Sequence, residues 1–396
     1  MTTADGPTPK THSRWPLGLL GTIALVAGVE SYIGARNVDL GTMYTIEWRL
    51  MSKAIKKQAA KAEILCFGTS LSSIAVSPLI VEERTGHPTY NLSLSGAQPY
   101  ASYVMLRHAL EAGAHPRAIV VDFKWTSIRN APAELERIVP EIATLGECAR
   151  HALDLGDWGF LARIALVKEM PSYACRVQIR DNIAAAIKGE EPTRNHQWLT
   201  QARNMRVNKG AHHTPKVPYK GEVDAADGRF FPAEWACNPM NEAYIHKFLD
   251  LADARGVPVF LLVPPVSPAA QARLDEQGTT DRYTKFLEGV MARHPGVVAL
   301  DARRSGYPNE AFYDASHVNR VGTADFSNAL ADLLKARLDG PAPADRWVAM
   351  PRFAGGQGQE RIEDFMDSYG HILAAQKVQD DEAKRLTKAT DDGVRR

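Results

Sequence analysis

Five short apolar runs constrain the fold of this chain more than any other feature of its sequence. The runs do not show sustained period-two alternation, which is typical of strands buried on both faces of a parallel sheet. Helical patterns separate several of them, so we predict an α/β domain with a five-stranded parallel sheet in a three-layer α/β/α arrangement. The runs are AEILCF at 62–67, TYNLSL at 89–94, RAIVVDF at 117–123, PVFLLV at 258–263 and VVALDA at 297–302.

Composition narrows the class of protein. The 396 residues are 45% hydrophobic and 23% charged, which is enough for one large domain with an elaboration or for two small domains. The formal net charge is only +1, so the sequence predicts no nucleic-acid partner. No internal repeat at the periods of solenoids or propellers is visible.

The N-terminal segment predicts contact with a membrane. Residues 15–34, WPLGLLGTIALVAGVESYIG, have about the length needed to cross a bilayer, and Glu30 alone interrupts their apolar character. Residues 1–14 precede them and carry basic side chains, as in a signal peptide or signal anchor. Small residues in this segment leave open whether a signal peptidase cleaves it. A buried core helix is the alternative to a targeting segment. We expect an uncleaved single-pass anchor in the cell membrane, with residues 1–14 in the cytoplasm and the globular part on the extracytoplasmic side.

The remaining chain divides into a linker, a domain and a tail. Residues 35–61 are predicted to be an exposed linker helix, and residues 62–340 the globular domain. An interruption at about 124–238, with helical stretches expected at 133–153 and 160–168, is typical of a lid, a binding wall or a partner surface. The charged residues 341–396 are expected to leave the core as a solvated helix or as disorder, with docking of a partner as the alternative.

Neither the histidines nor the cysteines predict a metal site or a cofactor. The adjacent His212 and His213 lie in a polar loop, and neighbouring residues rarely point at one ion, so both are expected to be solvated. Cys66 lies in an apolar run and is expected to be a buried thiol, whereas disulfide pairing among the other three cysteines stays open. The four cysteines, which form no Cys-x-x-Cys pair, are Cys66, Cys148, Cys175 and Cys237.

A turn rich in small hydroxyl residues follows the first apolar run. In ILCFGTSLSS, residues 64–73, the run ends at Gly68, Thr69 and Ser70. Ligands of open α/β sheets bind at the carboxyl ends of strands, so an ordinary turn, a phosphate cradle and a nucleophilic serine are the alternatives. The patterns of a Walker loop and of a dinucleotide fingerprint are both absent at this turn. Ser70 is therefore a candidate nucleophile, provided that a base lies elsewhere in the chain.

A candidate base lies near the end of the predicted domain. Asp314 and His317 occur in FYDASHVNR, directly before a segment whose apolar residues recur at helical spacing up to Gly340. A serine hydroxyl needs a base to remove its proton, and a carboxylate that fixes the tautomer of a histidine makes that base effective. A helix N-cap with a histidine beside it by chance is the alternative.

Three segments in this order resemble sequence blocks of the SGNH, or GDSL, hydrolase superfamily, over roughly residues 63–338 apart from the insertion. The resemblance implies a flavodoxin-like fold in which Ser70 is the nucleophile, His317 the base and Asp314 the residue that orients it. It also implies an oxyanion hole formed by the backbone N–H groups of Ser70 and Gly96. The segments are Gly68 to Ser70, with Thr69 lining the site, NLSLSG ending at Gly96, and DASH from Asp314 to His317.

One block of the superfamily, Gly-x-Asn after the third strand, is missing. Asp122 lies there instead, in VVDFKWTS, and is predicted to line the site. A carboxylate at this position would repel a developing oxyanion unless it were protonated or turned aside. The same departure is similar to the membrane-anchored, exported branch of the superfamily, which resembles alginate O-acetyltransferases and teichoic-acid D-alanylation proteins.

Three functional hypotheses follow. The first is an exported serine esterase or acyltransferase acting on an acylated, in particular O-acetylated, cell-surface polysaccharide or small ester; the resemblance implies a membrane-bound acyltransferase as partner. The second is a non-catalytic SGNH-like module that binds a surface polymer or scaffolds a cell-envelope assembly, which the missing asparagine favours. The third is a cytoplasmic phosphate-binding α/β protein. The acyl group, the acceptor and the choice between hydrolysis and transfer stay open.

Overall fold

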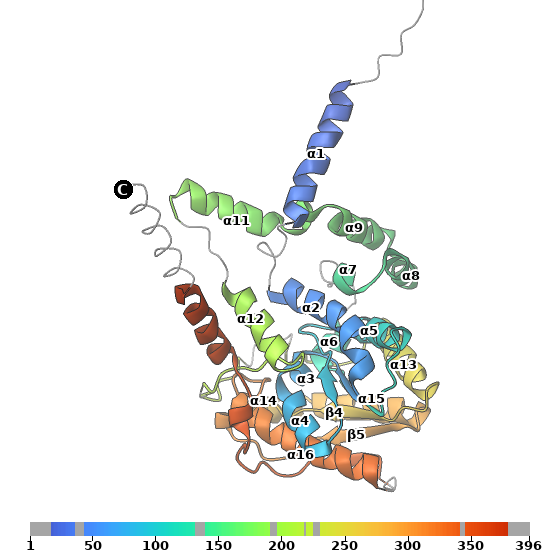
Figure 1. The fold of residues 1–396 in the computed structure, drawn as a ribbon. Helices are drawn as coiled ribbons and strands as arrows, with labels where there is room; N and C mark the ends of the chain where they lie inside the picture. The colour runs from blue at the N-terminus through green and yellow to red at the C-terminus, as the bar shows by residue number, and fades with distance from the viewer. Residues whose placement is uncertain are drawn as a thin grey trace, which may run out of the picture. The chain divides into compact units, whose positions relative to one another are not determined.

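Two compact units make up the described part of the chain. The computed structural model describes residues 17–35, 43–130, 139–190, 196–217, 219–224, 230–340 and 345–378. The larger unit contains the sheet (Figure 1). The smaller unit contains α1 (Leu17–Ala35), α10 (Pro171–Ala174) and α11 (Arg176–Ile187).

Helix α1 covers most of the segment predicted as an anchor. Its residues Gly18–Ala35 are long and apolar enough to cross a membrane, and none of them is buried in the structure. The one acidic side chain of this helix, Glu30, accepts hydrogen bonds from the backbone N–H and the hydroxyl of Ser172 in α10. The carboxylate in the apolar segment is thus satisfied within the smaller unit. The predicted cytoplasmic start at 1–14 and the last part of the predicted tail, 379–396, lie outside the described residues.

A single parallel sheet of six strands forms the centre of the larger unit, in the order β2-β1-β3-β4-β5-β6. The predicted α/β class with a parallel sheet is confirmed, but the count of five strands is wrong. The sixth strand escapes prediction because it is a three-residue edge strand with no buried residue. The strands are β1 (Ile64–Phe67), β2 (Thr89–Asn91), β3 (Ala118–Asp122), β4 (Val259–Val263), β5 (Val297–Asp301) and β6 (Trp347–Ala349).

Helices precede the sheet, connect its strands and follow the last of them (Figure 1). A proline stands in the first turn of several of them, including α4, α5, α10, α13 and α14, where its missing N–H costs no helical hydrogen bond. The helices are α2 (Met43–Lys57), α3 (Ser70–Ala75), α4 (Pro78–Thr85), α5 (Pro99–Glu111), α6 (Trp125–Arg129), α7 (Val139–Ile142), α8 (Leu145–Leu155), α9 (Trp158–Glu169), α12 (His196–Val207), α13 (Pro239–Asp253), α14 (Pro268–Glu276), α15 (Thr279–Arg293) and α16 (Arg320–Asp339).

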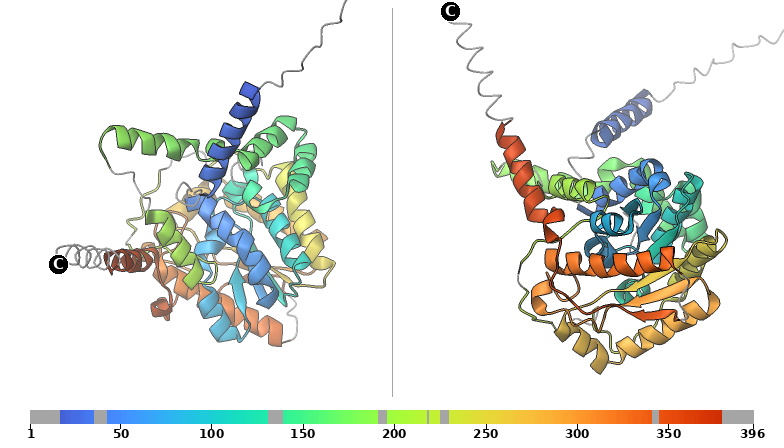
Figure 2. Two further views of the ribbon diagram at one scale, coloured as in Figure 1. Left: turned by 45° about the horizontal axis from the view of Figure 1, so that its top comes forward. Right: turned by 60° about the horizontal axis from the view of Figure 1, so that its bottom comes forward.

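Both faces of the sheet are buried, as the continuous apolar runs of the strands predict. In β1, Leu65 and Phe67 belong to one hydrophobic cluster, whereas Ile64 and Cys66 belong to another. Helices α5, α13 and α15 contribute to the first cluster, and α3, α4 and α16 contribute to the second (Figure 2). The carboxyl ends of the strands are therefore the part of the sheet where polar groups can gather.

Helix α2 belongs to the core, so its prediction as an exposed linker is wrong. Trp48, Met51 and Ile55 are each at most 2% exposed and pack in the same hydrophobic cluster as Leu65 of β1. They recur at helical spacing and form one apolar face, while the lysines of the helix, such as Lys53, lie on the exposed side. The number of Lys and Arg residues in this segment concealed the apolar face.

The interruption between β3 and β4 contains helices, but not the single helix expected at 133–153. Helix α7 ends at Ile142, and α8 begins after Thr144. The Thr144 hydroxyl accepts a hydrogen bond from the backbone N–H of Glu147 at 3.3 Å, and the Glu147 carboxylate accepts one from the backbone N–H of Thr144 at 2.6 Å. This capping box starts a new helix and separates α8 from α7. Residues 131–138 lie outside the described residues.

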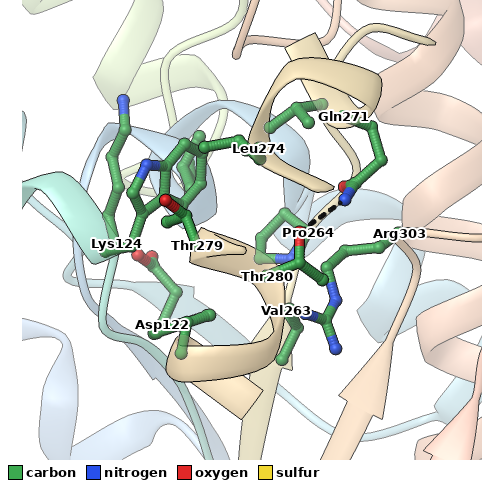
Figure 3. Close-up of a pocket in the computed structure, with 13 residues that line it drawn as sticks. Asp122, Lys124, Val263, Pro264, Gln271, Leu274, Thr279, Thr280 and Arg303 are labelled. Carbon is green, nitrogen blue, oxygen red and sulfur yellow. Dashed lines mark hydrogen bonds between the residues drawn. The ribbon is translucent and has the colours of Figure 1, made fainter. Parts of the chain in front are cut away.

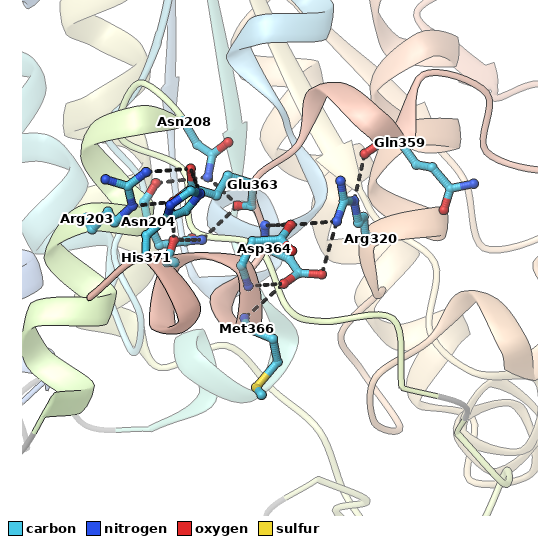
Figure 4. Close-up of polar contacts among 11 residues, drawn as sticks. Arg203, Asn204, Asn208, Arg320, Gln359, Glu363, Asp364, Met366 and His371 are labelled. Carbon is cyan, nitrogen blue, oxygen red and sulfur yellow. Dashed lines mark hydrogen bonds and ion pairs between the residues drawn. The ribbon is translucent and has the colours of Figure 1, made fainter. Parts of the chain in front are cut away.

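Part of the predicted tail is built into the domain, which corrects the expectation that residues 341–396 leave the core. After β6, Glu363 forms an ion pair with Arg203 of α12 at 2.7 Å, and Arg320 of α16 donates a hydrogen bond to the carbonyl oxygen of Gln359 at 2.7 Å (Figure 4). These contacts join positions that are far apart in the sequence. They follow no periodicity, so a sequence pattern cannot reveal them.

Candidate active site

The turn after β1 brings Ser70 to the carboxyl edge of the sheet. Strands β2 and β3 lie on opposite sides of β1, and a reversal of this kind is where open α/β sheets form a ligand crevice. Gly68 has a φ of +123°, and a Cβ atom at this position would lie 2.3 Å from Oδ1 of Asp122, so only glycine fits the turn. Thr69 then caps α3, of which Ser70 is the first residue.

Ser70, His317 and Asp314 form a hydrogen-bonded chain. Ser70 Oγ lies 2.8 Å from His317 Nε2, although the two residues are 247 positions apart. On the other side of the ring, His317 Nδ1 lies 2.8 Å from Oδ2 of Asp314 and 3.0 Å from its Oδ1. A proton on Nδ1 leaves Nε2 as an acceptor that faces the Ser70 hydroxyl, which is the tautomer a general base requires.

The electrostatics of Asp314 favour its ionised form. Burial raises the pKa of Asp314, but the hydrogen bond and charge of the His317 ring and the backbone N–H groups of Ser316 and His317 outweigh burial and hold this pKa below its ordinary value. The two N–H groups donate to Oδ1 at 2.8 and 2.9 Å. An ionised Asp314 can stabilise the positive charge that His317 acquires when it accepts a proton.

The loop before α16 is held in place at several points. The backbone N–H of Tyr313 donates to the carbonyl oxygen of His317 at 2.8 Å, which closes the loop on itself. The backbone N–H of Ser267, directly before α14, donates to the carbonyl oxygen of Ala315 at 2.9 Å. Asn319 caps α16 through its side-chain oxygen. The position of the histidine ring is therefore determined by a closed loop anchored at both ends.

The two predicted oxyanion donors lie on neighbouring segments. The backbone N–H of Leu94 donates to the carbonyl oxygen of Gly68 at 3.0 Å, so the segment after β2 runs beside the turn that carries Ser70. Gly96 is exposed and has a φ of +69°. Ser70 is the first residue of α3, so its N–H has no acceptor within the helix. Within the described residues, the Gly96 N–H also donates to no backbone acceptor.

Asp122 supports the turn that carries Ser70. It is 1% exposed, and its Oδ1 accepts hydrogen bonds from the backbone N–H groups of Thr69 at 2.9 Å and Ser72 at 3.1 Å. Its Oδ2 accepts the Thr69 hydroxyl proton at 2.7 Å. Both carboxylate oxygens are therefore turned aside to hold the turn that presents Ser70. At the end of β3, where the superfamily's third block implies an asparagine, the residue that the structure describes is Asp122.

Replacing Asp122 with alanine is expected to unfold the turn. Each buried donor left without an acceptor costs about 1–3 kcal/mol, and Asp122 serves three donors, so the free energy of unfolding should fall by about 3 kcal/mol or more. Asp122→Asn keeps one acceptor oxygen and should cost less. Urea denaturation measures both variants, with Asp332→Ala as the control because Asp332 is an exposed carboxylate of α16. Faster ester hydrolysis by Asp122→Asn would show that the native carboxylate faces the oxyanion.

Lys124 lies near the site and was not singled out by the sequence. Its Nζ lies 3.4 Å from Oγ of Ser316, in the loop that carries the histidine. Burial lowers the pKa of Lys124, while the charges of Asp314 and Asp122 act in the opposite direction. Figure 3 shows Lys124 and Asp122 on one side of a pocket that α14 and α15 close on the other. Leu71 also lines this pocket, so it adjoins the Ser70 turn.

His213 is buried and His212 is half-buried, so the prediction that both are solvated is wrong. His212 Nδ1 lies 2.8 Å from Oγ of Ser73, and burial, with smaller effects of His213 and His317, lowers the pKa of His212 to about 3. His213 is fully buried, its Nδ1 donates to the carbonyl oxygen of Ile74 at 2.9 Å, and burial lowers its pKa to about 4. Two neutral rings thus tie their loop to α3, and a neutral histidine can be buried at little cost once it is hydrogen-bonded.

In the part of the chain that the structure describes, one group of side chains lies close enough to share a metal ion: Asp250, Asp253 and His294. It includes no predicted site residue. His294 Nδ1 lies 2.7 Å from Oδ2 of Asp253, and its Nε2 lies 2.9 Å from Nδ1 of His246, so two hydrogen bonds account for the arrangement. All four cysteines lie in the described residues and none of them forms a disulfide, and Cys66 is buried as its position predicts.

No protein-family model matches the chain, and no curated protein matches it at a significant level. The interpretation of the site therefore depends on its geometry and on the chemistry of its residues.

Proposed function

We propose that this chain is a serine esterase or O-acyltransferase of the SGNH type. The observation that carries the proposal is the chain of 2.8 Å contacts from Ser70 Oγ to His317 Nε2 and from His317 Nδ1 to Asp314. The three-layer, flavodoxin-like architecture of the superfamily is part of the same proposal. The order 2-1-3-4-5 of the first five strands supports it, because this order is common among flavodoxin-like sheets.

The proposed reaction is acyl transfer through Ser70. Its Oγ attacks the acyl carbonyl carbon while His317 Nε2 takes the hydroxyl proton, and the backbone N–H groups of Ser70 and Gly96 bind the resulting oxyanion. His317 then returns the proton to the departing alcohol oxygen, which leaves an acyl group on Ser70. Water in an esterase, or a sugar hydroxyl in a transferase, attacks this acyl group by the same steps and releases Ser70.

The proposed substrate is an acylated, in particular O-acetylated, cell-surface polysaccharide or a small ester. Helix α1 supports a membrane anchor by its length and composition. The basic side chains in residues 1–14 favour a cytoplasmic start and an extracytoplasmic domain. A membrane-bound acyltransferase is the proposed partner, because an exported acyltransferase needs an activated acyl donor from the membrane.

A fluorophosphonate probe tests the proposal directly. The purified full-length protein in detergent should be labelled, because a base that removes its proton makes one serine far more nucleophilic than the others. Mass spectrometry of the digested protein should place the label on Ser70. Ser72 and Ser73 provide an internal control in the same peptide, since both are fully buried. A folded protein that takes no label and hydrolyses no acetyl ester would favour the non-catalytic polymer-binding module.

A further inference from the structure

Two neighbouring side chains of α2 hold the residue that precedes Gly96. Glu47 is 2% exposed, and its Oε1 accepts a hydrogen bond from the backbone N–H of Ser95 at 2.5 Å. Trp48 is fully buried, and its Nε1 donates to the backbone carbonyl oxygen of Ser95 at 3.3 Å. Both backbone polar groups of Ser95 are thus engaged by one helix, from the segment that the sequence predicts to be a linker.

These two bonds determine the direction of the Gly96 N–H. The carbonyl group of Ser95 and the N–H group of Gly96 belong to one planar peptide unit, in which they point to opposite sides. Trp48 binds the carbonyl oxygen, so the N–H points away from α2. Gly96 is exposed and has a φ of +69°, and glycine has no side chain to restrict its own rotation. External contacts are therefore needed to keep this donor oriented.

We propose that Glu47 and Trp48 are positioning residues that fix the Ser95–Gly96 peptide unit as an oxyanion donor for the reaction at Ser70. The inference rests on the proposed function. It assigns a role in the reaction to α2, a helix that lies outside all the sequence blocks that resemble the superfamily. A preorganised donor acts on the transition state more than on the bound substrate, so its misalignment lowers kcat and leaves KM nearly unchanged.

The carboxyl group of Glu47 also makes this donor sensitive to pH. Burial raises the pKa of Glu47 to about 7, and the hydrogen bonds from Ser95 act in the opposite direction. No charged group of the described residues contributes to this shift of the Glu47 pKa. Arg49, a cation two positions along α2, forms an ion pair with Glu141 of α7 at 2.7 Å instead. Below pH 7 the neutral carboxyl group still accepts the Ser95 N–H. Above pH 7 the Glu47 carboxylate, which binds the residue next to Gly96, carries a negative charge that opposes the developing oxyanion.

Steady-state hydrolysis of p-nitrophenyl acetate by the full-length protein tests the inference. Glu47→Ala should lower kcat by about 10- to 100-fold with KM within about 2-fold, because the loss of one oxyanion donor costs at most about 1000-fold. Trp48→Phe, which keeps an aromatic ring but removes the N–H, should cost less. Glu141→Gln is the matched control, since it weakens another polar contact of α2, the ion pair with Arg49, without touching Ser95, and should keep the wild-type kcat.

Glu47→Gln separates positioning from a merely structural role. Its amide oxygen can accept the Ser95 N–H at every pH, so the ratio of its kcat to that of the wild type should be near 1 at pH 6. The ratio should rise about 5-fold or more by pH 8.5, because only the wild type gains a charge. Taking the ratio cancels the effect on kcat of any group that titrates in the same way in both proteins. Thermal melts show whether each variant is folded.

The outcomes distinguish a failure of the inference from a failure of the proposed function. The inference would be overturned if folded Glu47→Ala had the wild-type kcat, or if the kcat ratio for Glu47→Gln did not change with pH. In either case the proposed function would still hold, provided that Ser70→Ala is inactive. Wild-type protein that neither hydrolyses the ester nor accepts the serine probe would overturn both.

Discussion

Ser70→Ala and His317→Ala are each expected to lower kcat for acetyl-ester hydrolysis by about 10⁶-fold, and the double variant should lose no more than either single one. The reason is the 2.8 Å contact between Ser70 Oγ and His317 Nε2, which makes nucleophile and base one unit. Without the hydroxyl there is no acyl intermediate, and without the ring the hydroxyl keeps its proton. Stopped assays at high protein concentration can measure the residual rate.

Ser73 and His212 provide the matched control for this experiment. Ser73 Oγ lies 2.8 Å from His212 Nδ1, on the same helix as Ser70, so the two serine-histidine pairs have contacts of equal length. Ser73 is fully buried, however, and burial lowers the pKa of His212 to about 3, which makes it a poor base. Ser73→Ala should therefore keep kcat within a few-fold. If Ser73→Ala lowered kcat as much as Ser70→Ala does, the assignment of Ser70 as the nucleophile would be wrong.

The features that the sequence predicts are those with local signals. An apolar run reveals β1, a glycine marks its end, and an amphipathic pattern locates α16 after His317. The carboxyl ends of parallel strands meet at one edge of a sheet, which predicts that the Ser70 turn lies where ligands bind. The pairing of Ser70 with His317, 247 positions away, follows instead from the resemblance to the SGNH blocks, because His317 does not directly follow a strand.

The features that escape prediction depend on side chains that bind distant backbone groups. Asp122 departs from the pattern of the SGNH blocks, and only its bonds to Thr69 and Ser72 show that it supports the turn. Glu47 looks like one charge among many in a basic segment, but it is buried against Ser95. A sequence gives the residue type at such positions, whereas burial and partner emerge only when the elements pack. The same holds for the contacts of residues 345–378 with α12 and α16.

Asp314→Asn is expected to lower kcat by about 10³- to 10⁴-fold while the protein stays folded. In the native loop, the backbone N–H groups of Ser316 and His317 both donate to Oδ1 of Asp314. An asparagine must place its amide oxygen there, which turns its NH₂ group toward His317 Nδ1. The histidine proton then moves to Nε2, so that the ring faces Ser70 as a donor and cannot act as a base. Asp339→Asn, an exposed carboxylate at the end of α16, controls for the loss of one negative charge.

The stability of this variant should depend on pH in a direction that the pKa of Asp314 determines. Hydrogen bonds and the charge of His317 hold this pKa below its ordinary value of 3.8 in spite of burial, so the native carboxylate stabilises the fold at every pH above that value. The contribution is lost as pH falls through the native pKa, because the folded state then takes up the proton that the unfolded state already carries. The melting temperatures of wild type and Asp314→Asn should therefore converge as the pH falls below about 4. Curves that stay parallel down to pH 2 would show that Asp314 is not held as a carboxylate by His317 and the loop, and the tautomer argument for His317 would fail with them.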